Sequence, residues 1–252
     1  MTDTTIDVAA RAAELEGKDA LEILRWASRT VGPKLTFATA FGPEGGVIVD
    51  LIAKAGLPID VFTLDTGVLF PETYALWRAL ETTYGLTIRA VRPEQTIEAQ
   101  TLSHGATLWE RDPDRCCELR KVQPLRAALT GFEAWITGIR REHTPERSAA
   151  KVVEQDRTFG LVKINPLVGW THDEVWAHIY ANDVPYHELH DRGFPSIGCQ
   201  PCTSAVGAGE DARAGRWRGA AKKECGLHVS PRTDAPISLI TPPTGGRPRT
   251  GA

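Results

Sequence analysis

The stretch LTFATAFGPEGGVIVDLIAKAGLPIDVFTLDTG, Leu35 to Gly67, decides the expected fold of this chain. LTFATA (35–40) and IDVFTLD (59–65) are short runs rich in β-branched and aromatic residues, which is typical of buried strands. Between them the turn FGPEGG (41–46) leads into an apolar helix that we predict from Val47 to Lys54. A strand, a helix and a second strand in this order predict a βαβ unit with parallel strands.

The same alternation continues along the chain. Further strand-like runs are LTIRAV (86–91), EAWITG (133–138) and LVKINPL (161–167), and helical patterns separate them. The sequence therefore predicts an α/β fold whose parallel sheet occupies about residues 31–170. Ligands of such sheets bind outside the carboxyl ends of the strands. We expect binding loops at 39–46, 65–67 and 138–141.

The pattern changes after about residue 170. A helix capped by Thr171 is predicted over 171–183, and the sequence then becomes rich in glycine and arginine. Residues 229–252 hold five prolines, and we expect this tail to be mobile. No internal repeat or clear linker is present. We therefore predict one domain over 1–228, with 171–228 as an extension of the sheet domain.

Composition and charge exclude several classes of protein. Hydrophobic residues make up 42% and charged residues 24%, which is ordinary for a globular protein. The chain has 29 Lys and Arg against 32 Asp and Glu, a net charge of −3, so we expect no nucleic acid among its partners. No apolar run reaches the ~18 residues that cross a bilayer, and the N-terminus lacks a signal pattern. We expect a cytoplasmic protein without a membrane partner; a homo-oligomer stays open.

The glycine-rich turn at 41–46 has two open interpretations. Its backbone N–H groups could face an anion at the start of the following helix. The glycines could equally serve only the geometry of a tight turn. Neither GxGxxG after the first strand nor GxxxxGK[ST] occurs, which argues against a dinucleotide fold and a P-loop.

Cysteine is the most informative residue type. The chain has five: Cys116, Cys117, Cys199, Cys202 and Cys225. An odd number without a signal peptide argues against a disulfide framework. Four of them form an adjacent pair and a CxxC, and four thiolates select zinc or an iron–sulfur cluster.

The adjacent pair favours a cluster over zinc. Neighbouring side chains diverge by ~100° on a helix, so one small ion would have difficulty binding both Cys116 and Cys117. A cubane presents separate irons, and each thiolate can reach its own. Cysteines that only pack in the core, or a redox-active CxxC, are the remaining alternatives. Arg115, Arg120 and Lys121 flank the pair, and a helix would place Lys121 on the same face as Cys117.

The fifth cysteine lies in a basic segment. Cys225 in KKECGLH is surrounded by Lys222, Lys223 and His228, and nearby positive charge favours a reactive thiolate. An unreactive surface cysteine is the alternative. Upstream, Arg213 and Arg216 are spaced i,i+3, so on a helix they would share a face suited to phosphate or sulfate, or would simply be a basic surface.

These motifs together resemble the assimilatory adenylyl-sulfate reductases. The resemblance rests on RCCELRK (115–121), PSIGCQPCT (195–203), the arginine segment around 213–217 and KKECGLH (222–228). LDTG (64–67) and ITGIRR (136–141) agree in kind and order, and the match spans roughly 20–228. It implies an adenine-nucleotide alpha-hydrolase-like fold and a reductase domain over 1–228. The implied reaction converts adenosine 5′-phosphosulfate to sulfite and AMP with thioredoxin, for sulfate assimilation and cysteine biosynthesis.

The resemblance also implies roles for individual residues. One 4Fe–4S cluster would be held by Cys116, Cys117, Cys199 and Cys202. Cys225, on the C-terminal extension, would be the nucleophile and would pass through an S-sulfocysteine. The residues implied to contact substrate are Lys121, Arg213, Arg216, His228, Leu64, Thr66, Gly138 and Arg140.

Three other functions are weighed against this one. Reductases of the 3′-phosphorylated substrate typically lack the two cysteine pairs, so the pairs favour the unphosphorylated substrate. An ATP-using adenylating enzyme of the same fold would need an SGGxDS-like loop, which FGPEGG is not. A zinc-binding protein without catalysis is the third. Two departures from the family are the loop without a nearby serine and a tail after His228 that is longer than the family needs.

Overall fold

The computed structural model describes residues 6–220, 222 and 224–227. The tail at 229–252, which the sequence predicts to be mobile, lies outside these residues, and so does His228. Within the described part, no helix is both long enough and apolar enough to cross a membrane. One reductase domain over 1–228 stays a prediction.

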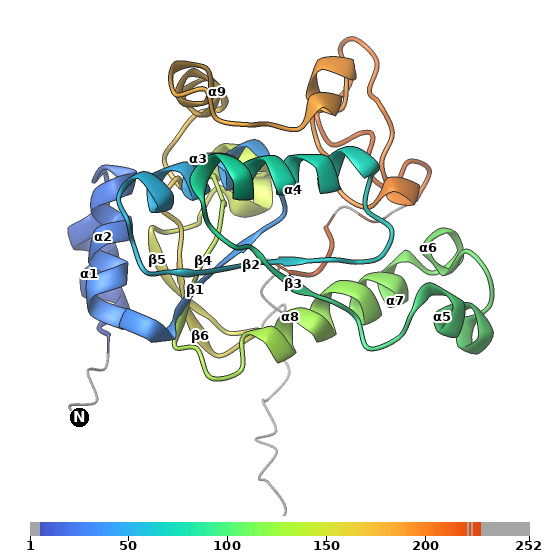
Figure 1. The fold of residues 1–252 in the computed structure, drawn as a ribbon, viewed down its shortest axis with the longest axis horizontal. Helices are drawn as coiled ribbons and strands as arrows, with labels where there is room; N and C mark the ends of the chain where they lie inside the picture. The colour runs from blue at the N-terminus through green and yellow to red at the C-terminus, as the bar shows by residue number, and fades with distance from the viewer. Residues whose placement is uncertain (1–5, 221, 223, 228–252) are drawn as a thin grey trace, which may run out of the picture.

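A six-stranded sheet forms the centre of the molecule, in the order β3-β2-β1-β4-β6-β5 (Figure 1). The strands are β1 Leu35–Thr39, β2 Asp60–Leu64, β3 Arg89–Val91, β4 Ala134–Ile136, β5 Val153–Asp156 and β6 Leu161–Ile164. All neighbours are parallel except β5 and β6. β1 pairs with β2 on one side and with β4 on the other, so the strand order reverses there. That reversal is where a parallel sheet leaves room for a ligand.

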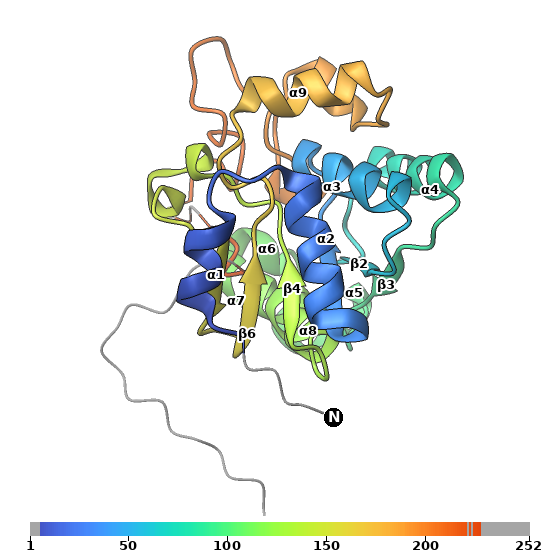
Figure 2. The same ribbon diagram turned by 90° about the vertical axis from the view of Figure 1, so that its left-hand side faces the viewer.

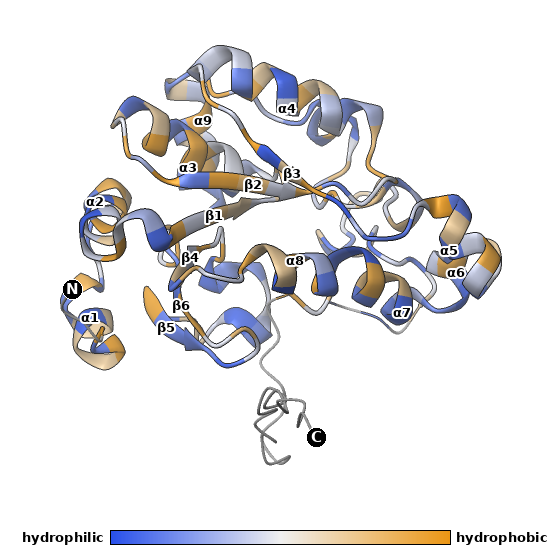
Figure 3. Ribbon diagram, turned by 60° about the horizontal axis from the view of Figure 1, so that its bottom comes forward, coloured by the Kyte–Doolittle hydropathy of each residue, from blue (hydrophilic) through white to orange (hydrophobic). Residues whose placement is uncertain are grey.

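Helices cover both faces of the sheet (Figure 3). The helices are α1 Val8–Leu15, α2 Ala20–Val31, α3 Pro43–Lys54, α4 Pro71–Tyr84, α5 Ile97–His104, α6 Leu108–Arg111, α7 Pro113–Cys117, α8 Gln123–Ala128 and α9 His172–Ala181. α3 and α4 lie on one face and α8 on the other. α9 lies across the outside of α3 (Figure 2), where His178 Nε2 is 2.8 Å from the Asp50 carboxylate.

Alternation along the strands divides the core into two clusters. In β4, Ala134 and Ile136 belong to the large cluster beneath α2, α3 and α4, whereas Trp135 packs on the opposite side with Leu125 of α8. In β2, Val61 and Phe62 divide in the same way. Successive side chains of a strand point to opposite faces, and here both faces are apolar.

The expected α/β fold is confirmed, with two differences in its elements. β5 was not expected, because its sequence VEQD has only one strongly apolar residue; it is an antiparallel edge strand that pairs with β6. The helix after the first strand begins at Pro43 rather than at Val47. Proline at the first helical position and Glu44 in the first turn both favour this earlier start.

Candidate active site

A cavity of about 200 Å³ opens at the carboxyl ends of β1 and β2. Its walls combine these strand ends with the β1–α3 loop, the π-helical turn between α7 and α8, the loop after β4, and the C-terminal extension. The polar and sulfur-bearing side chains that line it are Thr39, Thr63, Thr66, Thr73, Lys121, Arg147, Cys199, Arg213, Arg216, Glu224 and Cys225. Two of the three predicted binding loops therefore reach the cavity.

The β1–α3 loop is shaped by a close contact. Thr39 Oγ1 accepts a hydrogen bond from the Phe41 backbone N–H at 3.1 Å. A Cβ on Gly45 would lie 2.6 Å from that same hydroxyl, so glycine is needed there. Phe41, with a positive φ of 60°, turns its ring onto Trp77 at 5.6 Å between centroids. At Gly45 the glycine therefore serves close packing, one of the two interpretations of this turn.

The four paired cysteines gather around one small cavity next to the larger one. Cys116 and Cys117 end α7, and Cys199 and Cys202 flank the short turn at 200–202. The Thr66 hydroxyl is 3.3 Å from Cys199 Sγ. Burial, together with the neighbouring thiols, raises the pKa of Cys116 to about 11 and that of Cys202 to about 12. Thiols crowded in this way would ionise more readily with a bound cation.

The donor set bears on which inorganic group it could hold. In the described part of the chain, no group of three or more His, Cys, Asp or Glu is arranged to hold a metal ion. The four thiols nevertheless line one cavity. Four thiolates around one cavity are a donor set that suits either zinc or an iron–sulfur cluster.

Lys121 lines both the cysteine cavity and the larger cavity, and so connects the two. It belongs to the π-helical turn Glu118–Val122, which continues α7 into α8. Burial lowers the pKa of Lys121, but electrostatic interaction with Cys199 and Cys225 outweighs burial, and the pKa is raised. The lysine is therefore charged, and it interacts electrostatically with the paired cysteines and with Cys225. Such π-helical turns occur often at functional sites.

Arg120, one of the cations flanking the cysteine pair, is almost fully buried beside them. Its guanidinium donates to the Thr66 carbonyl and, at 3.0 Å, to Gln100 Oε1. It thereby fixes the loop after β2, which carries Thr66 to the Cys199 thiol. Leu64 and Thr66, which the resemblance assigns to substrate, both line the larger cavity.

Arg213 and Arg216 both reach this cavity, but the helix expected for them is wrong. The segment is a loop in which Arg216 forms an isolated antiparallel bridge with Thr203. A Cβ on Gly215 would lie 2.0 Å from the Ser204 carbonyl oxygen. The segment therefore packs tightly against the loop that contains Ser204. The two arginines thus reach the same cavity because of loop packing and not because of helical periodicity.

The Arg216 side chain packs on the ring of Trp217, and only some of its nitrogens form hydrogen bonds. Its guanidinium lies 4.6 Å from the Trp217 ring centre and reaches the Ile197 carbonyl at 3.3 Å. Its Nε is buried and has no hydrogen-bond partner among the described residues. A buried donor without a partner favours an acceptor supplied by a ligand.

The segment of Cys225 is held by charges that come from elsewhere in the chain. Glu224 accepts two hydrogen bonds from Arg147 at 3.0 and 3.1 Å, and Arg213 lies 3.4 Å from the same carboxylate. Lys222, expected to support the Cys225 thiolate, forms an ion pair with Asp114 instead. The cations that share the cavity with Cys225 are therefore Lys121, Arg147, Arg213 and Arg216.

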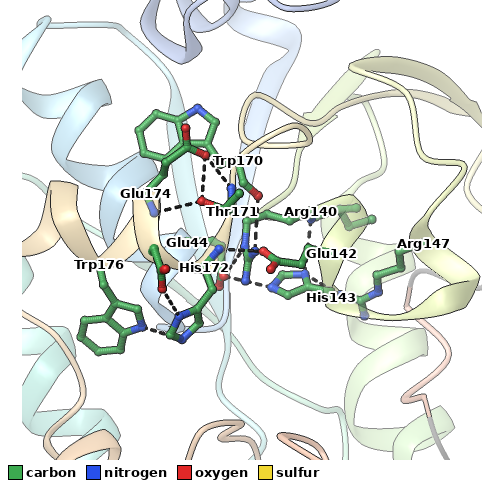
Figure 4. A network of polar contacts seen from close by, with 12 residues as sticks. Glu44, Arg140, Glu142, His143, Arg147, Trp170, Thr171, His172, Glu174 and Trp176 are labelled. Atoms are coloured by element: carbon green, nitrogen blue, oxygen red, sulfur yellow. Dashed lines mark hydrogen bonds and ion pairs between the residues drawn. The ribbon is translucent and has the colours of Figure 1, made fainter.

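Gly138 and Arg140 lie away from this cavity, unlike the other described residues that the resemblance assigns to substrate. Arg140 donates to Glu44 at 2.8 Å and to Glu142 at 2.7 Å, as Figure 4 shows. A Cβ on Gly138 would lie 3.0 Å from that of Glu44. The loop after β4 thus packs against the start of α3, and its Arg140 is committed to two carboxylates.

Sequence reasoning missed Arg147, Glu224 and Trp217 as lining residues. In the sequence, Trp217 directly follows Arg216 and Glu224 follows two lysines, and neither neighbourhood indicates a cavity wall. Arg147 carries no sequence signal: it ends the short 3-10 turn Pro145–Arg147, and its contact with Glu224 joins residues 77 positions apart. The proximity of Arg147 to residues 224 and 225 is a long-range contact that no local spacing encodes.

Fold and site together define an α/β protein of the adenine-nucleotide alpha-hydrolase-like class. A fold likeness extends to yeast FAD synthetase, with a TM-score of 0.51 and 16% identity over 81% of this chain and 70% of that one. Residues 34–205 match the phosphoadenosine phosphosulfate reductase domain, so the chain belongs to that family. The resemblance seen in the sequence is thereby confirmed.

Individual relatives agree with this family. An adenosine 5′-phosphosulfate reductase of Oceanobacillus iheyensis is 47% identical over 216 residues, 85% of this chain and 90% of that protein. Adenosine 5′-phosphosulfate reductase 1 of Bacillus subtilis is 46% identical, over 84% of this chain and 91% of that protein. The crystal structure of a phosphoadenylyl-sulfate reductase from Candida auris, in complex with phosphate, has a TM-score of 0.71 and 36% identity, covering 82% of this chain and 99% of that one.

Proposed function

We propose that this protein is a thioredoxin-dependent reductase that converts adenosine 5′-phosphosulfate to sulfite and AMP. The observation that carries the proposal is the meeting of Cys225 with Lys121, Arg213 and Arg216 in one cavity at the strand ends. A thiol facing three cations suits attack on an anionic sulfur. The curated relatives are named for the same substrate. A cytoplasmic location is proposed with this role.

The proposed chemistry proceeds by two displacements. The Cys225 thiolate attacks the sulfur of the sulfate group, the bond from sulfur to the bridging oxygen breaks, and AMP leaves with that electron pair. The enzyme then carries Cys225 as S-sulfocysteine. One thiolate of reduced thioredoxin attacks Cys225 Sγ and releases sulfite, forming a mixed disulfide. The second thioredoxin thiol resolves it, so the two electrons come from thioredoxin and Cys225 returns as a thiol.

The cationic residues would act on the charges of the substrate. Arg213 and Arg216 would bind the phosphosulfate, and the unpartnered Nε of Arg216 offers a donor for it. Lys121 would stabilise charge as the bond to sulfur changes. The positions of Leu64 and Thr66 suit contacts with the nucleotide. His228 lies outside the described residues, and its role as a substrate contact stays a prediction; Gly138 and Arg140 we now assign to supporting the start of α3.

We further propose that Cys116, Cys117, Cys199 and Cys202 hold one 4Fe–4S cluster. The shared cavity and the cations Arg120 and Lys121 that line it support this assignment. When bound, the cluster would supply negative charge that holds Lys121 charged beside the substrate site. Every bond-making step proposed above belongs to Cys225 and thioredoxin.

The covalent step is tested by mass spectrometry of the intact protein. Incubation with adenosine 5′-phosphosulfate and no reductant should add one SO₃ group at Cys225 and release AMP. Cys225→Ser should keep its iron and bind substrate, yet form no adduct, because a serine hydroxyl is far less acidic. Reduced thioredoxin should then release sulfite from the wild-type adduct. An adduct on another cysteine, or one formed by Cys225→Ser, would contradict the assignment.

The same assay separates the competing functions. The Candida auris reductase is named for the 3′-phosphorylated substrate, so both nucleotides should be compared; we expect faster adduct formation with the unphosphorylated one. Iron, sulfide and zinc analysis after purification without oxygen tests the cluster. Cys199→Ser should lose iron while Cys225→Ser keeps it. Stoichiometric zinc without sulfide would contradict the cluster and support a zinc site.

A further inference from the structure

Glu224 is an anion inside a cavity that otherwise collects cations. Among the described residues lining the cavity it is the only carboxylate, and it shares that lining with Lys121, Arg147, Arg213 and Arg216. Only 12% of its side chain is exposed, and the Arg147 side chain is 14% exposed. A pair this buried is screened little by solvent. The carboxylate therefore lies where an anionic ligand would find its strongest counter-charges.

The geometry of Glu224 resembles that of a bound oxyanion. Both of its oxygens accept from Arg147 Nη2, at 3.1 and 3.0 Å, and Arg213 Nη2 lies 3.4 Å from Oε2. Carboxylate, phosphate and sulfate present similar oxygens to a guanidinium. A ligand that takes these two guanidinium groups must therefore compete with Glu224 for them.

The arginine side of this pair is anchored to the sheet domain. The other nitrogen of Arg147 donates to His143 Nδ1 at 3.3 Å, and His143 Nε2 lies 2.9 Å from Glu44 Oε1 (Figure 4). The backbone N–H of Arg140 also donates to His143 Nδ1, so the ring proton lies on Nε2 and is donated to Glu44. Glu44 lies in the first turn of α3. Arg147 is thus held in place through its Nη1 by His143, while its Nη2 binds Glu224.

The carboxylate side is carried by the segment that holds the proposed nucleophile. Cys225 follows Glu224 directly, and Gly226 follows with a φ of +87°, a conformation that only glycine adopts readily. Leu227 then packs against the core beside α8. Breaking the pair therefore frees the residue on one side of Cys225 and leaves the anchor on the other side in place.

We propose that Glu224 is an internal counter-anion that occupies a phosphate- or sulfate-binding subsite and is exchanged when an anionic ligand enters. The exchange couples arrival of the ligand to the position of Cys225. It also sets specificity, since a ligand without oxyanion charge cannot replace the carboxylate. Naming the natural ligand as a phosphosulfate rests on the proposed function; the subsite itself requires only an oxyanion.

The test measures binding of AMP, inorganic sulfate and adenosine to the full-length holoprotein by calorimetry. Glu224→Gln removes the competing charge with little change of shape. It should bind AMP and sulfate about tenfold more tightly than wild type, the range for one charge-assisted contact, and adenosine equally. Glu224→Asp keeps the charge and should bind all three like wild type.

Glu210→Gln is the matched control for net charge. Glu210 belongs to the same C-terminal extension and pairs with Arg218, outside the cavity. It should leave anion affinity unchanged. If Glu224→Gln binds AMP and sulfate as wild type does, or more weakly, the carboxylate only stabilises the local structure, and the proposed exchange with a ligand is wrong.

A second measurement follows the coupling to Cys225. Alkylation of Cys225, mapped by peptide mass, should be faster in ligand-free Glu224→Gln than in wild type and unchanged in Glu210→Gln. Equal rates in all three proteins would contradict the coupling. Failure of the proposed function looks different: the oxyanion affinities would shift as stated, while adenosine 5′-phosphosulfate gave no Cys225 adduct in any variant.

Discussion

At the scale of single residues, a missing side chain decides where Arg216 can lie. A Cβ on Gly198 would come 2.3 Å from Arg216 Nη2, well inside contact distance. Gly198 directly precedes Cys199, so the same glycine lets the arginine cross the first cysteine of the CxxC. The guanidinium thereby passes beside the first cysteine of the CxxC and lines the larger cavity. Its orphaned Nε then remains available to an acceptor in the cavity.

We therefore expect Gly198→Ala to weaken substrate binding and spare the fold. The clashing atoms belong to the far end of a flexible side chain, which can move away at little cost. The displaced Arg216 would lose its proposed contact with the substrate anion, worth about 1.5–3 kcal/mol for a charged hydrogen bond. Calorimetry with adenosine 5′-phosphosulfate on the Cys225→Ser background measures the loss, and thermal unfolding measures stability.

Gly169→Ala provides the comparison for that variant. Nothing lies within 4 Å of a Cβ at Gly169, and it is outside the residues that line the cavity. It should change neither binding nor the unfolding midpoint. If Gly198→Ala binds substrate as Gly169→Ala does, Arg216 makes no contact with the anion.

At the scale of elements, strands and capped helices were readable from the sequence, whereas the substrate-facing loops were not. The β-branched run at 35–39 and the Thr171 cap are local signals, and both elements form where expected. The π-helical turn at 118–122 and the loop of Arg213 and Arg216 depend on packing between distant segments. The helical interpretation of the two arginines failed because Gly215 packs on the Ser204 carbonyl, a contact that spacing cannot reveal.

The candidate site divides in the same way. Residues whose chemistry is unusual for their type, such as five cysteines without disulfides, could be singled out from the sequence. Arg147 and Glu224 are ordinary residue types, and only their meeting makes them informative. Arg140, which the resemblance assigns to substrate, takes part in a polar network that joins the loop after β4 to α3, and its role as a substrate contact stays a prediction.

That network predicts an acid-sensitive contact between two elements. Burial opposes ionisation of Glu44, but the hydrogen bond from His143, together with the charge and hydrogen bond of Arg140, outweighs it and lowers the pKa of Glu44 from 4.5 to about 2. Because the pKa in the folded state lies below that of the unfolded chain, the stabilisation is complete above about pH 5 and is lost as the pH falls towards 2. The contribution at neutral pH is about 3 kcal/mol.

Glu44→Gln should therefore lose stability at pH 7 and differ least from wild type near pH 2–3. Urea unfolding across this pH range gives the difference directly. Glu142→Gln is the control, because Glu142 binds the same Arg140 but is 54% exposed, and exposed pairs contribute little. An equal, pH-independent loss in both variants would show that the Glu44 charge does not matter.

At the scale of the whole molecule, the site exists only because distant parts of the chain meet at one edge of the sheet. The Gln200 backbone N–H donates to the Val68 carbonyl at 2.8 Å, and Trp217 N–H donates to the Cys202 carbonyl at 3.0 Å. The CxxC thus joins the loop after β2 to the C-terminal extension. Cys116 and Cys117 bring the end of α7 to the same point. A cluster held there would link the end of α7 to the C-terminal extension through their cysteines, next to hydrogen bonds that already join these segments to the loop after β2.

Loss of the cluster should therefore loosen these segments and leave the sheet intact. Amide hydrogen exchange is the measurement that distinguishes the two regions, since local opening and global unfolding have different free energies. In protein stripped of iron by a chelator, or in Cys199→Ser, exchange should rise at 113–122 and 199–217. The buried strands β1, β2 and β4 should keep their protection, because their core clusters do not include the cysteines. Cys225→Ser, which we expect to retain the proposed cluster, should exchange like wild type throughout. Uniformly faster exchange over the whole chain would mean that the cysteine group stabilises the entire fold, and unchanged exchange at 199–217 would mean that it ties nothing together.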